Sequence, residues 1–168
     1  LVAIVEYLKL GDAATTAVVI ATVFTVLVGC VSFSGSIVTF LKLQVLMTTR
    51  PVVFPGGRFV IAATLAGTLA SAVWVVDSMG TTPLLVLAGL SLLFGVLFVL
   101  PVGGADVPIV ISLLNAFTGL TVAAGGYVLD TTLLIIAGTL VGASGTILTR
   151  LMAEAMGRSL FGTLFGAF

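Results

Sequence analysis

The sequence predicts an all-α fold: a polytopic transmembrane helix bundle with five complete spans. Of the 168 residues, 60% are hydrophobic and only 7% are charged, whereas a soluble domain carries about 25% charged residues. Six basic and six acidic residues are too few to build a water-facing surface at this length. The charges separate five uncharged runs, each long enough for one spanning helix and too short for two: 13–41, 59–76, 78–105, 107–129 and 131–149.

Each uncharged run is expected to form one helix. The predicted bounds are 14–41, 59–76, 83–100, 107–129 and 131–150. The last helix is expected to continue past the lipid to about Met156. Before the first run, the stretch "LVAIVEYLKL" is typical of the C-terminal end of an apolar helix that starts upstream. We therefore expect the chain to be part of a longer protein.

The connections between the runs contain turn residues. "RPVVFPGGR" (50–58), "DSMGTTP" (77–83) and "PVGGADVP" (101–108) combine proline with glycine. Proline at a helix start loses no intrahelical hydrogen bond, and glycine accepts left-handed backbone angles. The connection "LDTT" (129–132) is very short, and Asp130 or a following threonine is expected to cap the last helix.

The charges are distributed unequally between the two ends of the predicted bundle. Because five spans alternate in direction, the 42–58 loop, the 101–106 loop and the C-terminal tail share one face. That face holds five of the six basic residues, namely Lys42, Arg50, Arg58, Arg150 and Arg158. Basic residues near helix ends stay cytoplasmic. The sequence therefore predicts a cytoplasmic tail, or its topological equivalent in an organelle.

Small residues at helical spacing predict how the helices pack, because close approach and polar contacts hold membrane helices together. Gly138, Gly142 and Gly145 recur on one face of the last helix, and Gly119 with Ala123 does so on the fourth. The third helix is mostly bulky and apolar. We therefore expect the third helix to face lipid and the last two to face the bundle interior.

One amide lies near the middle of the fourth run, in "IVISLLNAFTGLTVAAGGYVL" (109–129). Asn115 has two interpretations: an interhelical hydrogen bond that fixes packing, or a polar group that lines a water or ion path. Ser112, Asn115 and Gly119 lie three or four residues apart and form a narrow polar stripe. Ser144, between Gly142 and Gly145, is a candidate partner on the last helix.

None of the five runs contains Asp, Glu, His, Lys or Arg, and histidine is absent from the whole chain. Asn, Ser and Thr order water but do not take up protons near neutral pH. These helices alone can shape a conduit, but any titrating group must come from a helix outside the chain or from a boundary residue such as Asp106. Asp106 and Arg158 are either solvated loop charges or a pair that ties the 101–106 loop to the end of the last helix.

Other classes of site are not predicted. The single cysteine, Cys30, excludes a disulfide framework and a cysteine-based metal site. Without histidine there is no Ser/His/Asp or Cys/His catalytic arrangement, so no catalytic residue and no metal site are predicted. Zero net charge gives no indication of a nucleic-acid partner. The glycines of "GGAD" and "GASG" lack the strand–turn–helix context of a dinucleotide site, so no cofactor is expected to bind this chain.

Several strings together resemble one family. "GCVSFSGSIVTFLKLQ" (29–44), "RPVVFPGG" (50–57), "GGADVPIVISLLNAFTGLTVAAGGYVL" (103–129) and "LVGASGTILTRLMAEAMGRS" (140–159) are similar to the membrane domain of the beta subunit of proton-translocating NAD(P)+ transhydrogenase. The resemblance runs in order along nearly the whole chain, and 103–159 is its most specific part. It implies that 1–168 is a transmembrane proton-translocating domain, with an NADP(H)-binding domain following residue 168.

The resemblance also implies an activity, partners and site residues. The family couples hydride transfer between NAD(H) and NADP(H), bound by other domains, to proton passage. Its implied partners are the lipid bilayer, the alpha subunit or alpha-like membrane and NAD(H)-binding parts, the C-terminal NADP(H) domain and a second copy of the whole complex. Its implied location is the bacterial or mitochondrial inner membrane. Asn115 occupies the motif of the family's proton-path asparagine. The Gly/Ser motif of the last helix corresponds to Gly142, Ser144 and Gly145, and the family links the charges matching Asp106 and Arg158 to the NADP(H) domain.

The sequence departs from the family pattern in two places. Ala143 stands where members often have a second serine beside Ser144. The family's proton-handling histidine lies in the upstream helix, of which only the tail, about Leu1–Leu8, is present. Two rival functions stay open: a transporter or channel for a small polar solute, and a structural membrane anchor for soluble domains.

Overall fold

A computed structural model describes residues 2–53, 55–78, 80–159 and 162, without the side chain of Asp12. The described residues contain no strand, which confirms the predicted all-α class. Two short 3-10 turns, Gly11–Ala13 and Gly104–Asp106, accompany the helices. The helices are α1 (Val2–Leu10), α2 (Thr16–Leu43), α3 (Gly57–Ser78), α4 (Thr81–Val99), α5 (Val107–Val128) and α6 (Thr132–Ala155).

The five predicted spans are confirmed. Helices α2 to α6 are each long and apolar enough to cross a membrane. Their ends lie within two residues of the predicted bounds, and α6 continues to Ala155, next to the expected end at Met156. The charges and the Gly/Pro connections therefore located the helix ends well.

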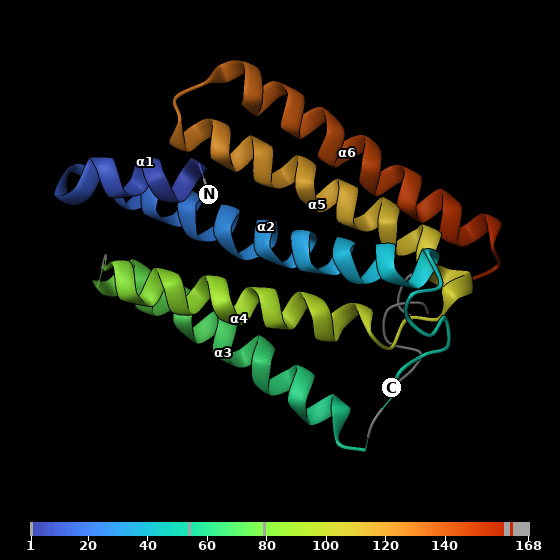
Figure 1. Cartoon of the computed structure of the whole chain (residues 1–168). Coiled ribbons are helices and arrows are strands. Elements are labelled where there is room, and N and C mark those ends of the chain that lie inside the picture. Colours follow the sequence, from blue (N-terminus) through green and yellow to red (C-terminus); the bar gives the residue numbers. More distant parts are fainter. Residues whose placement is uncertain (1, 54, 79, 160–161, 163–168) are drawn as a thin grey trace.

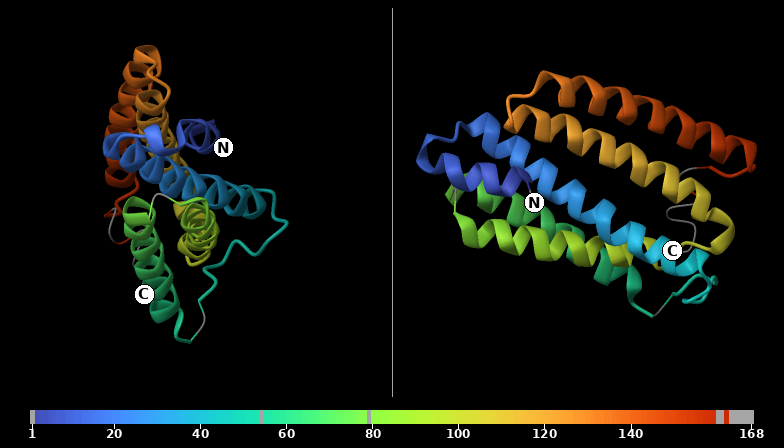
Figure 2. Two further views of the ribbon diagram at one scale, coloured as in Figure 1. Left: turned by 90° about the vertical axis from the view of Figure 1, so that its left-hand side faces the viewer. Right: turned by 45° about the horizontal axis from the view of Figure 1, so that its top comes forward.

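The spans lie side by side in a curved row in the order α6, α5, α2, α4, α3 (Figures 1 and 2). The short helix α1 folds back along the start of α2 and also touches α5. Helix α4 packs between α2 and α3 and leaves Leu85 and Leu93 exposed, so the prediction that the third span faces outward holds for one side of the helix only. Helix α6 lies at the edge of the row and packs chiefly against α5, so its predicted interior position is wrong.

The physical reason for the position of α4 lies in two small residues one turn apart. Ser91 and Gly95 are both buried, and a Cβ added at Gly95 would lie only 2.6 Å from the Val31 carbonyl oxygen of α2. A single narrow face is thus enough to bring an otherwise bulky helix into close contact with its neighbour.

The contact between α5 and α6 is closer still and rests on several glycines. A Cβ at Gly119 would lie 2.5 Å from the backbone nitrogen of Gly142, and one at Gly145 would lie 3.0 Å from Ala116. A Cβ at Gly138 would collide with the backbone of Ala123. The predicted small-residue packing of these two helices is therefore confirmed.

Hydrogen-bonded turns close the ends of α5 and α6. At the end of α5, Asp130 has φ of 50° and the Thr131 amide donates to the Gly126 carbonyl at 2.8 Å. This pattern is a Schellman cap, which requires a left-handed residue at that position. Of the two candidate caps for α6, the threonine and not Asp130 takes the position: Thr131 is the N-cap residue. Its side chain makes no capping hydrogen bond, because its hydroxyl donates to the Leu129 carbonyl instead.

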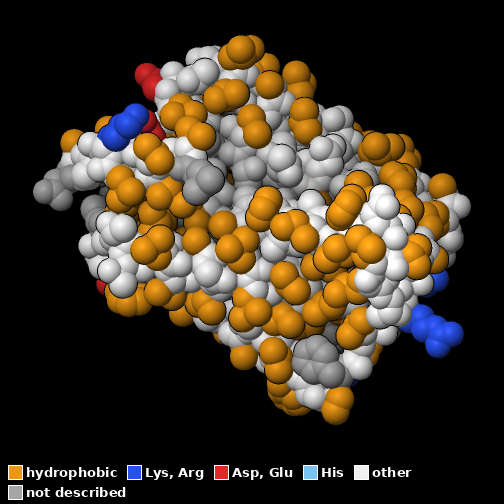
Figure 3. Space-filling view, viewed as in Figure 1, with side chains coloured by type: hydrophobic (Ala, Val, Ile, Leu, Met, Phe, Trp, Pro, Cys, Tyr) orange, Lys and Arg blue, Asp and Glu red, His pale blue; other side chains and the backbone are white. Residues whose placement is uncertain are grey.

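Charged side chains lie at the ends of the bundle, and apolar side chains cover its length (Figure 3). The ends of α2, α4 and α6 meet the starts of α3 and α5 at one end of the row, which brings together the basic residues assigned to one face. Lys9 and its ion-pair partner Glu6 lie on α1 at the opposite end. An apolar belt between two charged ends is what a lipid bilayer requires.

Candidate functional site

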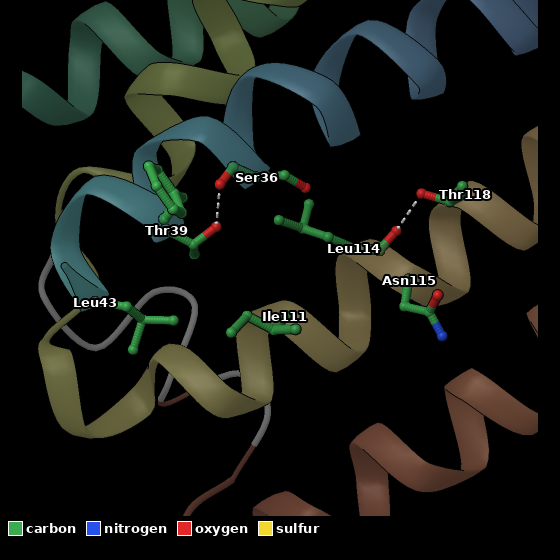
Figure 4. A pocket seen from close by; sticks show the side chains of 8 residues that line it. Ser36, Thr39, Leu43, Ile111, Leu114, Asn115 and Thr118 are labelled. Atoms are coloured by element: carbon green, nitrogen blue, oxygen red, sulfur yellow. Dashed lines mark hydrogen bonds between the residues drawn. The ribbon is translucent and has the colours of Figure 1, made fainter.

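A pocket of about 310 Å³ lies between α2 and α5. Its walls come from one face of each helix (Figure 4). It is open on the side of the bundle, because most of its lining residues are exposed in this chain. The lining residues are Ser36, Thr39, Phe40, Leu43, Ile111, Leu114, Asn115 and Thr118.

Helical spacing explains why these residues share the pocket. Positions three or four apart lie on the same face of a helix. On α5, the face with Ile111, Asn115 and Thr118 is left uncovered between the side that packs on α6 and the side that packs on α2. The pocket is therefore the part of the α2–α5 boundary that no other described helix covers.

Asn115 contributes an amide to this pocket from the middle part of α5. Its side chain is exposed, and among the described residues it has no hydrogen-bond partner. The interpretation of Asn115 as a packing hydrogen bond within these helices therefore does not hold in this chain. The amide has two donors and one acceptor oxygen available to a ligand, to water or to another helix.

Hydroxyl groups flank the amide on both helices. The Thr118 hydroxyl donates to the Leu114 carbonyl at 2.9 Å, and the Thr39 hydroxyl donates to the Gly35 carbonyl at 2.8 Å. Such bonds to the preceding turn satisfy the hydroxyl proton inside a membrane helix. The oxygen lone pairs remain free to accept a hydrogen bond. The polar part of the pocket can thus order water, but it contains no acid or base that exchanges a proton.

Ser112 lies on a different face of α5 from the pocket. Its hydroxyl accepts a hydrogen bond from Thr149 of α6 at 2.9 Å, and both side chains are buried. A second interhelical bond joins the Ser32 hydroxyl of α2 to the Leu114 carbonyl at 3.2 Å. In these two hydrogen bonds between described residues, serines and not the asparagine join α5 to α6 and α2.

The predicted Gly/Ser motif of α6 is divided between two faces. Gly142 and Gly145 are buried against α5, where they allow the close approach described above. Ser144 is exposed on another side of α6 and donates to its own helix, to the Val141 carbonyl at 3.2 Å. The structure does not bring Ser144 to the pocket that contains Asn115.

Asp106 and Arg158 form the ion pair that the sequence suggested. The Arg158 Nε atom lies 3.4 Å from Asp106 Oδ1, and the side chains are 52% and 13% exposed. The Asp106 oxygen accepts no hydrogen bond among the described residues, so the contact is one between charges. Asp106 precedes the first residue of α5. Gly157, with φ of 64°, follows the C-cap residue of α6 and directs the Arg158 amide back to the Ala153 carbonyl at 2.9 Å. The pair therefore ties the start of α5 to the end of α6.

Lys42 has a role that the sequence did not indicate. Near the end of α2, it is only 1% exposed, and its Nζ atom donates to the carbonyls of Val99, Leu100 and Val102 at 3.1, 2.6 and 2.6 Å. In the sequence, Lys42 is one of the five basic residues expected at one face of the bundle. A lysine after an apolar run gives no signal of burial, because its partners lie nearly sixty residues further along the chain.

No group of three or more His, Cys, Asp or Glu side chains able to hold a metal ion occurs among the residues described. The site consists of a laterally open polar pocket on α5 and an ion pair at the start of the same helix. Asn115 lies nine positions after Asp106, a helical rise of about 14 Å. One helix thus joins a charged end to a polar group at membrane depth.

Comparison with known proteins identifies the family. Residues 1–168 match the family described as NAD(P) transhydrogenase beta subunit. Two curated sequences named NAD(P) transhydrogenase subunit beta, both from Rhodospirillum rubrum, are each 42% identical to this chain over 141 residues. The aligned part covers 84% of this chain and 30% of each relative, so the chain spans about a third of the length of the curated relatives it matches. With its five membrane-spanning helices, the chain is an integral membrane protein that belongs to the NAD(P) transhydrogenase beta subunit family.

Proposed function

We propose that this chain is the proton-conducting membrane part of an NAD(P) transhydrogenase. Protons would cross beside α5, coupled to hydride transfer between NAD(H) and NADP(H) in soluble domains outside the chain. The supporting observation is the amide of Asn115 in a laterally open pocket, with no hydrogen-bond partner among the described residues. An uncompensated polar group in hydrocarbon costs several kcal/mol, so the amide requires water or a polar group from another helix.

The residues of the pocket have distinct parts in this proposal. Asn115 binds water or a protonatable side chain of the upstream helix, and Thr39 and Thr118 offer further oxygens to the same water. The titrating group is supplied from outside these five helices, since none of the pocket residues takes up a proton. Gly142 and Gly145 hold α6 against α5, and the path through Ser144 that the sequence suggested would require a further helix beside α6.

The charged end of α5 is proposed to couple the bundle to the soluble domain. Asp106 and Arg158 form an ion pair at the end of α6, and we propose that a soluble domain attached after residue 168 meets the bundle there. We propose that the redox state of bound NADP(H) changes the contacts of this pair. The change would then alter, through α5, the side to which the proton site is open. The proposed setting is the bacterial or mitochondrial inner membrane, with the tail on the cytoplasmic or matrix side, in a complex with the alpha subunit and a second copy of the whole enzyme.

Proton pumping by the full complex in liposomes tests the proposal. We expect acidification or alkalinisation of the lumen only when both NADH and NADP+ are supplied, because proton passage depends on hydride transfer. A transporter for a small polar solute would give no pumping that depends on both nucleotides. That result would contradict the proposal.

Substitution of Asn115 tests the role of the pocket. Asn115→Leu keeps the size of the side chain and removes the amide, so we expect pumping to fall by more than about tenfold while the complex still inserts. Thr139→Val is a matched control, because it removes an exposed hydroxyl from α6 outside the pocket. If Asn115→Leu pumps as well as the control, the pocket has no part in proton passage, which is the result expected of a membrane anchor.

A further inference from the structure

Lys42 is a fully buried cation whose three donors are all used. Its ammonium group donates to the carbonyls of Val99, Leu100 and Val102. A lysine ammonium has three N–H donors and no acceptor, so this set of carbonyls saturates it. The residue is neither in the pocket nor in an ion pair among the residues described. Its burial therefore requires an explanation other than solvation or proton passage.

The three carbonyls belong to the end of α4 and the residues that follow it. Helix C-termini leave carbonyls without intrahelical partners and carry a partial negative charge. Lys42, on the neighbouring helix α2, donates hydrogen bonds to these carbonyls and places a positive charge beside the partial negative charge of the α4 end. Because burying an unpaired charge is very costly, the α2 end and the α4 end are held together as one unit.

The segment that Lys42 holds leads directly to the ion pair. Asp106 lies four positions after Val102. The same segment is also bound to the 44–53 connection, through Val52 N to Leu100 O at 3.2 Å and Gly104 N to Thr49 O at 2.8 Å. The connection between α4 and α5 is therefore fixed on one side by α2 and its following loop, and on the other side by Arg158 of the α6 end.

The residues around Lys42 on α2 form a wall of the pocket. Thr39, Phe40 and Leu43 lie within one turn of it and line the pocket on the α2 side. A shift of the 100–106 connection thus has two routes to the pocket. One runs directly along α5, and the other runs through Lys42 to the α2 wall.

We infer that Lys42 is a positioning residue that links the Asp106–Arg158 connection to the α2 wall of the pocket. This inference rests on the proposed function and adds a second contact through which the soluble domain controls the proton site. With Lys42 in place, a shift of the 100–106 connection moves both the α2 wall and the α5 wall of the pocket. Without the Lys42 side chain, the same shift moves only the α5 wall.

The test compares proton pumping with hydride transfer in the full complex. For Lys42→Met, which keeps the chain length and removes all donors, we expect the protons pumped per hydride transferred to fall at least about fivefold, the lower end of typical allosteric couplings. Hydride transfer itself is expected to persist, since the nucleotides bind elsewhere. Lys42→Gln retains two donors and is expected to give a smaller loss, of about twofold to threefold, and it decides the question if the Met variant fails to insert.

A thiol probe tests the link to the α2 wall directly. With Leu43→Cys as the single reactive cysteine, we expect NADP(H) to change the rate of labelling by a membrane-permeant thiol reagent. We expect Lys42→Met to abolish that change. A lysine that only stabilises a helix end would leave the nucleotide dependence of labelling intact, and that outcome would overturn the inference.

Two controls separate this inference from general destabilisation. Lys9→Met removes an exposed lysine at the opposite end of the bundle and is expected to leave the pumping ratio unchanged. Gly126→Ala crowds the α5–α6 contact far from Lys42, since its Cβ would lie 2.8 Å from Leu134 Cβ and Ile135 N. If Lys42→Met lowers pumping and hydride transfer in parallel, as Gly126→Ala is expected to, Lys42 is only a structural cap. If Asn115→Leu abolishes pumping while Lys42→Met leaves the ratio intact, the inference fails and the proposed function stands.

Discussion

The two sides of α5 differ sharply in how they are covered. The side toward α6 is formed by Ala116, Gly119 and their neighbours and lies in direct contact with the backbone of α6. The side with Ile111, Asn115 and Thr118 borders an open pocket. Only about 60° of helical rotation separates Ser112, which is buried and hydrogen-bonded, from Asn115, which is exposed.

This difference shows how a membrane helix combines rigidity with a polar site. The glycine side fixes the position of α5, because backbones in contact leave no room for adjustment. The open side leaves an amide available for water or for another helix. A proton site that must change its exposure benefits from such an arrangement, since one side is held while the other is accessible. We therefore expect substitutions on the packed side of α5 to lower stability more than substitutions on the open side.

The largest effect on stability is expected from Gly138→Ala, on the packed side. The added methyl group would collide with the backbone of Ala123 and lie 2.6 Å from the Gly119 carbonyl oxygen. Overpacking of this kind costs about 1–3 kcal/mol, and a backbone contact places it at the upper end. Thermal unfolding of the complex in detergent measures the loss. Gly89→Ala on α4 is the control, because nothing lies within 4 Å of its Cβ, and equal stability of the two variants would contradict the close α5–α6 contact.

A smaller loss, of about 1 kcal/mol, is expected from Gly145→Ala. The new Cβ would lie 3.0 Å from Ala116 Cα and Cβ, so a shift of a few tenths of an ångström relieves the contact. The same unfolding measurement should place this variant between Gly138→Ala and Gly89→Ala. A loss as large as that of Gly138→Ala would mean that α6 cannot move along this part of α5.

The hydrogen bond between Ser112 and Thr149 is expected to contribute about 0.6 kcal/mol, the typical value inside membrane proteins. A double-mutant cycle with Ser112→Ala and Thr149→Val isolates this coupling energy. A coupling of zero would indicate that the two hydroxyls do not bond in the assembled complex.

The smallest effect on stability is expected from Asn115→Leu, on the open side. Because the amide has no partner among the described residues, its loss should change the free energy of unfolding by less than about 0.5 kcal/mol, although pumping collapses. A destabilisation above about 1 kcal/mol would show that the amide holds a helix in place, and the contrast between the two sides would then weaken.

The sequence predicted the local features of this molecule better than the order of its helices. The ends of α2 to α6 followed from charges, prolines and glycines. The Asp106–Arg158 contact was one of two alternatives that the sequence left open for these charges. The neighbours of α4 did not follow, because average side-chain size hid the narrow face formed by Ser91 and Gly95.

The burial of Lys42 and the separation of Ser144 from Asn115 were not predictable for a related reason. Both depend on which helix lies beside which, and that order is set by contacts between residues far apart in the chain. Periodicity shows which residues of one helix share a face. It does not show which neighbour covers that face, and none of the described residues covers Asn115.

The close pairing of α5 and α6 bears on how the chain folds during its insertion into the membrane. A Schellman turn joins α5 to α6, and each of these two helices makes its closest contacts with the other. Such a pair of low contact order forms quickly and needs little help from the rest of the chain. We therefore expect the hairpin of 107–155 to assemble as a unit during membrane insertion and then dock onto the earlier helices through α2. An arrest peptide placed after Ala155 should register a pulling force from this hairpin even when α3 and α4 are replaced by unrelated polyleucine spans.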